Sequence, residues 1–297
     1  MRSSCTNPVA WFGSRAAGAL AVAAFAAAGV PGQALAKGAS ANSSGGAGAK
    51  TIAPGIDTSL STKRFFSASR HAVTFSFRLH GLSGPATVTV RLVRRSGNAV
   101  LKTWKRTLAN SDWHSFHWDG SKSGRLQPDG SYAFRISAKS ADGSSIGQAS
   151  GSGKNQVTMH NYAFPLRGSH TFGDGFGAPR SGHTHQGQDI MASCGTTIVA
   201  ARGGTVKKNA YQSAAGNYLV ITSDGTGQDF VYMHMPHLSK KQEGQHVYTG
   251  QQIGKVGQTG DATACHLHFE MWTSPGWYSG GHAFDARPSL DRWDRYS

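Results

Sequence analysis

Two histidines separated by one residue give this chain its clearest potential for metal chemistry. His266 and His268 stand in the sequence His-Leu-His-Phe-Glu, in which polar and apolar side chains alternate. Because successive side chains of a β-strand point to opposite faces, the alternation predicts a strand with His266, His268 and Glu270 on one face. Leu267 and Phe269 then point into a core. Two imidazoles on one face of a strand can bind a metal ion.

A second group of potential ligands lies upstream, in the sequence His-Gln-Gly-Gln-Asp. His185 and Asp189 fall on one side of an extended segment, and Gly187 between them disfavours a helix. Together with the histidine pair they supply two imidazoles, one carboxylate and a spare histidine. Three such ligands and a fourth position open to water are the ligand set of a catalytic zinc site, so we expect one Zn²⁺ ion per chain.

The first residues have the layout of an export signal. Arg2 and Arg15 precede an apolar, alanine-rich run from Ala16 to Val30, and a small-residue site follows at Ala34–Ala36. This order predicts a signal peptide over residues 1–36. The apolar run is too short for a permanent anchor, and nothing later is apolar enough to span a bilayer. We therefore expect a secreted or cell-wall protein, extracellular or periplasmic, with no stable membrane insertion.

Cysteine usage fits an oxidising compartment. Cys5 lies in the predicted signal peptide, which leaves Cys194 and Cys265. An even pair in an exported chain predicts a disulfide, and Cys265 directly precedes the histidine pair. The alternative is that both cysteines bind a structural zinc ion, although neither forms the C-x-x-C spacing typical of such sites.

Positive charge is concentrated in the first half of the chain. Residues 51–157 contain 15 Lys and Arg against 5 Asp and Glu, whereas residues 158–297 contain 11 against 10. A basic module beside a nearly neutral one predicts that the first binds a polyanion and the second performs chemistry. For an exported protein we expect an anionic cell-wall polymer rather than nucleic acid. A solubilising surface is the alternative.

Short alternating segments separated by Gly, Asp and Pro turns predict an all-β chain. Residues 37–50 form a flexible linker rich in Gly, Ser and Ala. Residues 51–157 are predicted to form a β-sandwich, with strands over 73–79, 86–93, 99–104, 113–118 and 132–136. Residues 158–297 are predicted to form an antiparallel β-rich domain, with strands over 196–200, 218–222, 230–234, 252–256 and 266–272. No amphipathic helix of useful length is expected there.

The end of the first module resembles a known domain. Trp118-Asp119-Gly120, a short polar loop and Pro128 to Tyr132 are similar to the immunoglobulin-like domain of flagellar hook-capping proteins. The resemblance implies an immunoglobulin-like sandwich over about a hundred residues and says little about function.

The second module, from Phe164 to about Leu290, resembles the lysostaphin-type peptidoglycan endopeptidases, family 23 of the metallopeptidases. H-E-x-x-H is absent, so a helix-borne zinc site is not expected. The motifs that carry the resemblance are, in order, His185-x-Gly187-x-Asp189, Ala192 to Ala200, Gly216 to Ile221, Tyr232-x-His234, Gly250 to Gly254, Gly257 to Gly260 and His266 to Glu270.

The resemblance implies a zinc endopeptidase that acts on peptidoglycan. It implies that His185, Asp189 and His268 bind zinc and that His234 and His266 are the catalytic histidines. Which histidine acts as base and which stabilises the oxyanion is left open. Tyr232 shares the predicted strand face of His234, so it either positions substrate or packs beside the cleft.

The role of Glu270, the oligomeric state and the alternative functions complete the expectations from the sequence. Glu270 lies outside the implied ligand set; a hydrogen bond to a metal ligand is one role for it, and we expect a plain structural role instead. We expect a monomer. Two rival functions remain: a non-catalytic wall-binding or hydrolase-activating protein, and a protease of glycine-rich proteins.

Overall fold

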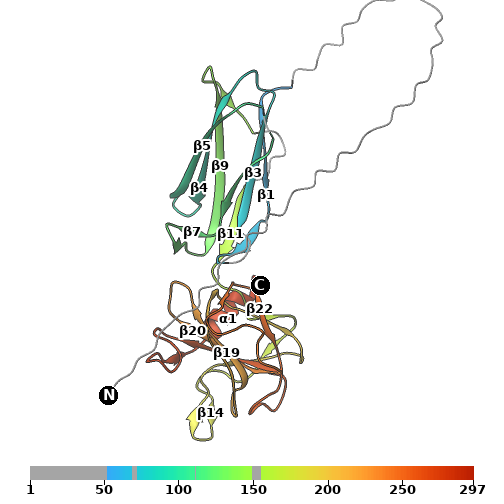
Figure 1. Ribbon diagram of the computed structural model, residues 1–297, viewed down its shortest axis with the longest axis vertical. Coiled ribbons are helices and arrows are strands. Elements are labelled where there is room, and N and C mark those ends of the chain that lie inside the picture. Colours follow the sequence, from blue (N-terminus) through green and yellow to red (C-terminus); the bar gives the residue numbers. More distant parts are fainter. Residues whose placement is uncertain (1–51, 69–71, 111, 149–154) are drawn as a thin grey trace, which may run out of the picture. The chain divides into compact units, whose positions relative to one another are not determined.

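Residues 52–68, 72–110, 112–148 and 155–297 are described in the computed structural model of the chain (Figure 1). The predicted signal peptide (1–36) and linker (37–50) lie outside these residues. Within the described part of the chain, no helix is both long and apolar enough to cross a membrane.

The N-terminal strands form two main sheets over a shared core. The first sheet has the order β1 (Gly55–Leu60), β3 (Val73–His80) and β6 (His114–Trp118). The second has the order β2 (Arg64–Phe66), β11 (Gln156–His160), β9 (Gly130–Ser140), β4 (Ala86–Arg94) and β5 (Val100–Leu108), and β10 (Ser145–Ile146) pairs with β9. β7 (Ser121–Lys122) and β8 (Arg125–Leu126) form a separate small hairpin.

Alternation along β3 and β4 explains how these two sheets enclose a core. Every second residue of β3, including Phe75 and Phe77, is buried, and the residues between them are more exposed. Phe75 and Phe134 stack with ring centroids 4.9 Å apart, which joins β3 of one sheet to β9 of the other. Apolar faces turned towards each other in this way are the basis of a two-sheet packing.

The C-terminal strands form a separate set of sheets. The largest has the order β13 (Thr171–Phe172), β16 (Gln188–Met191), β23 (His266–Trp272), β20 (Asp229–Met235), β19 (Gly216–Ser223), β18 (Gly204–Gln212) and β21 (His246–Val247), and β24 (Ala283–Phe284) pairs with β23. A three-stranded sheet contains β12 (Leu166–Arg167), β17 (Thr197–Val199) and β22 (Gln252–Lys255). β14 (Pro179–Arg180) and β15 (His183–Thr184) form a hairpin.

A short helix, α1 (Arg287–Asp294), follows the last strand. The sequence analysis did not anticipate it, because the helix has only two turns. Leu290 and Trp293, three residues apart, are buried and join the core of the large sheet.

The all-β fold class predicted from the sequence is confirmed, and all pairings of the large sheet are antiparallel. The immunoglobulin-like character of the first part and the domain boundaries stay predictions. β11 runs to His160 and therefore crosses the boundary that we drew between residues 157 and 158, because Thr158 and Met159 pair with β9.

Candidate metal centre

The central strand β23 carries the histidine pair between two neighbouring strands. Asp189 on β16 lies directly opposite His268 in the strand register, so the sheet itself places a carboxylate beside an imidazole. Leu267 and Phe269 lie in the buried core on the opposite face. The alternation predicted for this strand is therefore confirmed.

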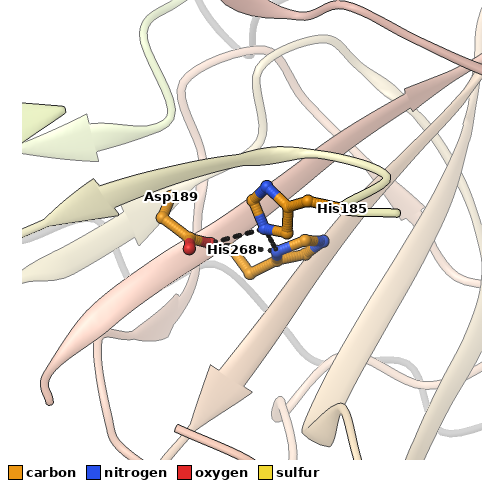
Figure 2. Close-up of side chains that lie close together, drawn as sticks. All are labelled: His185, Asp189 and His268. Carbon is orange, nitrogen blue, oxygen red and sulfur yellow. Dashed lines mark hydrogen bonds and ion pairs between the residues drawn. The ribbon is translucent and has the colours of Figure 1, made fainter. Parts of the chain in front are cut away.

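His185 reaches the same point from the loop between β15 and β16. Its Nε2 atom lies 2.8 Å from Nδ1 of His268 and 3.1 Å from Oδ1 of Asp189 (Figure 2). The third side of this triangle, from His268 Nδ1 to Asp189 Oδ1, is 3.0 Å. Among the residues that the structure describes, these three side chains form a cluster with the composition of a metal site.

Gly187 makes this approach possible. A Cβ atom at this position would lie 2.6 Å from the carbonyl oxygen of Phe269 and 2.8 Å from Nε2 of His268. Both distances are shorter than van der Waals contact, so a side chain here would displace the ring of His268. The motif therefore has glycine at position 187 because a side chain there would clash.

The distances within the cluster fit a zinc ion. Two ligands bound tetrahedrally at about 2.0–2.2 Å lie roughly 3.3–3.6 Å from each other. The observed separations of 2.8–3.1 Å need only a small outward shift to reach that geometry.

Hydrogen bonds on the outer nitrogens fix which atoms face the cluster. His185 Nδ1 lies 2.8 Å from the carbonyl oxygen of Gly175, and His268 Nε2 lies 3.0 Å from a carboxylate oxygen of Glu270. These oxygens only accept hydrogen bonds, so each outer nitrogen carries the proton. When both rings are neutral, the inner nitrogens present lone pairs to each other and to the Asp189 carboxylate, an arrangement that favours a proton or a metal ion between them.

The pKa values of His268 and Asp189 also favour a positive charge within the cluster. Burial disfavours a charged His268, but hydrogen bonds and attraction from Asp189 and Glu270 outweigh it and raise the pKa of His268 to about 9. Burial likewise opposes ionisation of Asp189, yet hydrogen bonds from His185 and His268 hold the pKa of Asp189 well below its usual range. A proton can satisfy one inner nitrogen at a time, whereas a zinc ion satisfies all three donors.

The two histidines expected to be catalytic lie beside the cluster. His266 Nε2 is 3.6 Å from Oδ1 of Asp189, and the rings of His234 and His266 are 4.6 Å apart between centroids. Nδ1 of His266 donates to the carbonyl oxygen of Ala264, and Nδ1 of His234 donates to that of Thr259, each at 2.8 Å. Both rings are therefore held with an unprotonated Nε2 when neutral. Burial is the largest effect on His234 and lowers its pKa to about 4.

His234 owes its place to an irregular backbone. Its φ angle is +65°, and the pairing of β19 with β20 shifts register beside it, so the strand bulges there. The bulge turns His234 away from the face of Tyr232. The shared face predicted for the two residues is therefore wrong. Of the two roles considered for Tyr232, packing fits the structure, because Tyr232 is fully buried in the core and accepts a hydrogen bond from the Ala201 backbone N–H at 2.8 Å.

Three residues that the sequence analysis did not assign to the site belong to its surroundings. Glu270 is buried and accepts hydrogen bonds from His268 and, at 2.7 Å, from Nε1 of Trp272. Arg180 donates to Oδ2 of Asp189 at 3.5 Å. Tyr278 is 69% exposed, and its hydroxyl donates to the Gln186 side chain at 3.3 Å. Alternation placed Glu270 on the face of His268, where the structure shows the hydrogen bond in place of a plain structural role, but no sequence signal pointed to the other two.

The predicted disulfide is present. Cys194 and Cys265 are bonded, with Cα atoms 5.3 Å apart. The bond joins the segment after β16 to the residue before His266. It therefore ties together the two parts of the chain that supply the cluster, and the alternative of a structural zinc site on these cysteines is excluded.

These features define a candidate metal centre on an antiparallel sheet, and a comparison with known families points to a class of peptidases. Residues 183–285 match the family described as Peptidase family M23. Peptidoglycan DD-endopeptidase ShyC of Vibrio cholerae is 41% identical over 87 residues, which cover 29% of this chain and 20% of that protein. Glycyl-glycine endopeptidase ALE-1 of Staphylococcus capitis is 32% identical over 112 residues, which cover 37% and 30%.

Among solved structures, the catalytic domain of the antimicrobial peptidase lysostaphin from Staphylococcus simulans is 30% identical to the chain. The match covers 41% of this chain and 92% of that one, with a TM-score of 0.38. The chain spans about a fifth of the length of ShyC. Residues 183–285 thus match an M23 peptidase domain, as the resemblance found in the sequence implied.

Proposed function

We propose that the protein is a secreted zinc metalloendopeptidase that hydrolyses peptide bonds in the cross-links or stems of peptidoglycan. The relatives named as peptidoglycan DD-endopeptidase and glycyl-glycine endopeptidase support the substrate class. The observation that carries the proposal is the convergence of His185, Asp189 and His268 within an M23 peptidase domain.

The donor atoms of these three residues would hold the zinc ion. A zinc ion bound there would act as a Lewis acid, polarising a peptide carbonyl and lowering the pKa of a water molecule. Asp189 offers a charged carboxylate, because its surroundings hold its pKa well below the usual range. Glu270 keeps the ring of His268 in the tautomer that binds metal.

His234 and His266 would move the protons. When a ring is neutral, its Nε2 is free to accept a proton, because its Nδ1–H is held by a backbone carbonyl. A neutral ring can take a proton from the attacking water as a general base, and a protonated ring can stabilise the developing oxyanion. The low pKa of His234, about 4, keeps it neutral at pH 7.

Two substitutions separate the metal-binding role from the catalytic one. We expect His268→Ala to lose bound zinc and His266→Ala to keep zinc but lose release of peptides from purified sacculi. Metal analysis and the sacculus digest measure the two effects. The exposed His237 offers a matched control, since His237→Ala should change neither.

Either of two results would contradict the proposal. Equal loss of zinc in both variants would remove the proposed division of roles. A wild-type protein that holds zinc but releases no peptide would favour a non-catalytic wall protein. A mass spectrum of the digested muropeptides identifies the bond that is cut. Faster cleavage of a glycine-rich polypeptide than of sacculi would instead favour a protease that acts on glycine-rich proteins.

A further inference from the structure

The outward face of strands β9, β4 and β5 has an unusual composition. These strands lie side by side in the second N-terminal sheet (Figure 1). On β4 the side chains of Val88, Val90 and Leu92 are buried, so the alternate positions face outwards. Three consecutive rows of outward residues on these strands form what we call the cationic face, and the next row, Ala133–Val93–Val100, is apolar and bounds it. Its nine residues are Thr87, Thr89, Arg91, Thr103, Lys105, Thr107, Arg135, Ser137 and Lys139.

The strand register arranges these nine residues in three rows. The rows are Arg135–Arg91–Thr103, Ser137–Thr89–Lys105 and Lys139–Thr87–Thr107. Every row contains at least one cation, and the other positions are all hydroxyl residues. All nine side chains can therefore donate hydrogen bonds, and none is acidic or apolar.

The four cations of this face are not neutralised by the protein. Among the described residues, no ion pair involves Arg91, Arg135, Lys105 or Lys139. The other N-terminal sheet differs, because the Arg78 on its outer face forms an ion pair with Asp57 at 2.9 Å.

The pairing of Arg91 with Arg135 adds to this contrast. The two residues are direct cross-strand neighbours, and like charges in that position destabilise a sheet. An ordinary solvated surface intersperses both signs of charge. A face that retains only one sign is suited to an external partner of the opposite sign.

The spacing of the donors suits an extended chain of anions. Neighbouring strands lie about 4.8 Å apart, and outward residues along one strand repeat at about 6.8 Å. A linear polymer crossing the strands therefore meets a new donor at every strand.

The composition of the face also selects among polyanions. Proteins that bind single-stranded nucleic acids stack the bases on aromatic side chains, and the nine residues include no aromatic ring. A polymer with its charges on flexible side chains, such as polyglutamate, would lose side-chain freedom on binding. Phosphodiesters in a polymer backbone avoid that cost, and both Arg and Lys bind phosphate. We propose that the cationic face binds a linear phosphodiester polymer without bases.

Binding of fluorescent poly(glycerol phosphate) to the full chain tests this inference. With the counterion-release slope for single strands, four phosphate contacts weaken binding roughly 50-fold between about 50 and 200 mM salt. The face variant replaces all four cations with threonine, which suits a strand: Arg91→Thr, Lys105→Thr, Arg135→Thr and Lys139→Thr. We expect it to bind at least about tenfold more weakly at low salt and to lose most of the salt dependence.

A control variant removes the same formal charge elsewhere through Lys122→Thr, Arg125→Thr, Lys240→Thr and Lys241→Thr. It should bind like the wild type. A second variant with only Lys105→Thr and Lys139→Thr should lose about half of the salt slope, and it serves if the fourfold variant does not fold.

Two outcomes would overturn the inference. One is a face variant that binds poly(glycerol phosphate) as tightly as the control variant. The other is a wild-type protein that prefers an oligo-dT strand or polyglutamate. Because the assay measures binding without cleavage, its result does not depend on the proposed peptidase function.

Discussion

Replacing Glu270 with glutamine tests whether the surroundings of the metal ligands set metal affinity. The buried carboxylate accepts two hydrogen bonds, at 3.0 Å from Nε2 of His268 and at 2.7 Å from Nε1 of Trp272. Both donors are N–H groups, so the site needs an acceptor on each side. Glutamine has the same shape but one carbonyl and one amide NH₂. It would therefore turn a donor towards one of the two N–H groups.

The expected loss of zinc affinity follows from these contacts. Removing the charge weakens the hold on the ring of His268, and partners of metal-bound histidines typically contribute 10–100-fold to metal affinity. This range equals about 1.4–2.7 kcal/mol in the free energy of zinc binding. The protein should also unfold more easily, because a buried N–H left without an acceptor costs about 1–3 kcal/mol.

Zinc affinity measured by competition with a chromogenic chelator gives the result directly. Glu243→Gln is the matched control, because Glu243 is the other glutamate of the chain, and it is exposed. It should leave zinc affinity unchanged. If Glu270→Gln bound zinc as tightly as the control, Glu270 would have no role in holding His268, and our account of the lone-pair cluster would fail.

Three further substitutions test the framework of the site. Gly187→Ala should weaken zinc binding, since its Cβ would lie 2.8 Å from a ring atom of the ligand histidine on β23; the chelator competition measures it. Replacing Cys194 and Cys265 with serine should lower the free energy of unfolding in urea by about 4 kcal/mol, because the bond closes a loop of 71 positions. Lys207→Met should cost about 3 kcal/mol in the same assay, because it leaves the fully buried Asp229 without the ammonium 2.7 Å away.

Each of these has a control within the protein. Gly84→Ala should have no effect on zinc, because nothing lies within 4 Å of an added Cβ there. Reduction of the wild type should reproduce the serine variant, and an unchanged urea midpoint would show that the disulfide does not stabilise the fold. Adding Asp229→Asn to Lys207→Met should recover most of the lost stability. If the double variant is no more stable than Lys207→Met, the loss does not come from an unpaired buried charge.

Strands with a regular pattern could be predicted from the sequence, and irregular ones could not. β23 was placed at its observed bounds because polar and apolar residues alternate along it from His266 to Met271. β18 was missed although it has nine residues, since Val206 is its one fully buried large apolar residue and Lys207 and Lys208 follow directly. α1 was missed because two buried residues are too few to establish a helical period.

Some contacts of the candidate site could likewise be predicted from the sequence, and others could not. Alternation is a property of neighbouring residues, so it sufficed to place His268 and Glu270 on one face of β23. The register that brings Asp189 beside His268 joins residues 79 positions apart, and the sequence implied their contact only through the family resemblance. The contact of Arg180 with Asp189 depends on the β14–β15 hairpin, and the geometry of this hairpin cannot be predicted from the spacing of the residues.

The position of His234 could not be predicted from the sequence, because it depends on an irregular backbone. A regular strand would place His234 on the face of Tyr232, inside the core, where no imidazole could serve chemistry. The left-handed backbone at His234, with φ of +65°, instead directs it to His266 and His268. Gly257 makes room for this bend, because an added Cβ would lie 2.6 Å from the His234 carbonyl oxygen. A non-glycine residue held in this conformation is strained, and such strain persists where the surrounding structure enforces it for function. The irregular backbone is thus itself support for a catalytic role of His234.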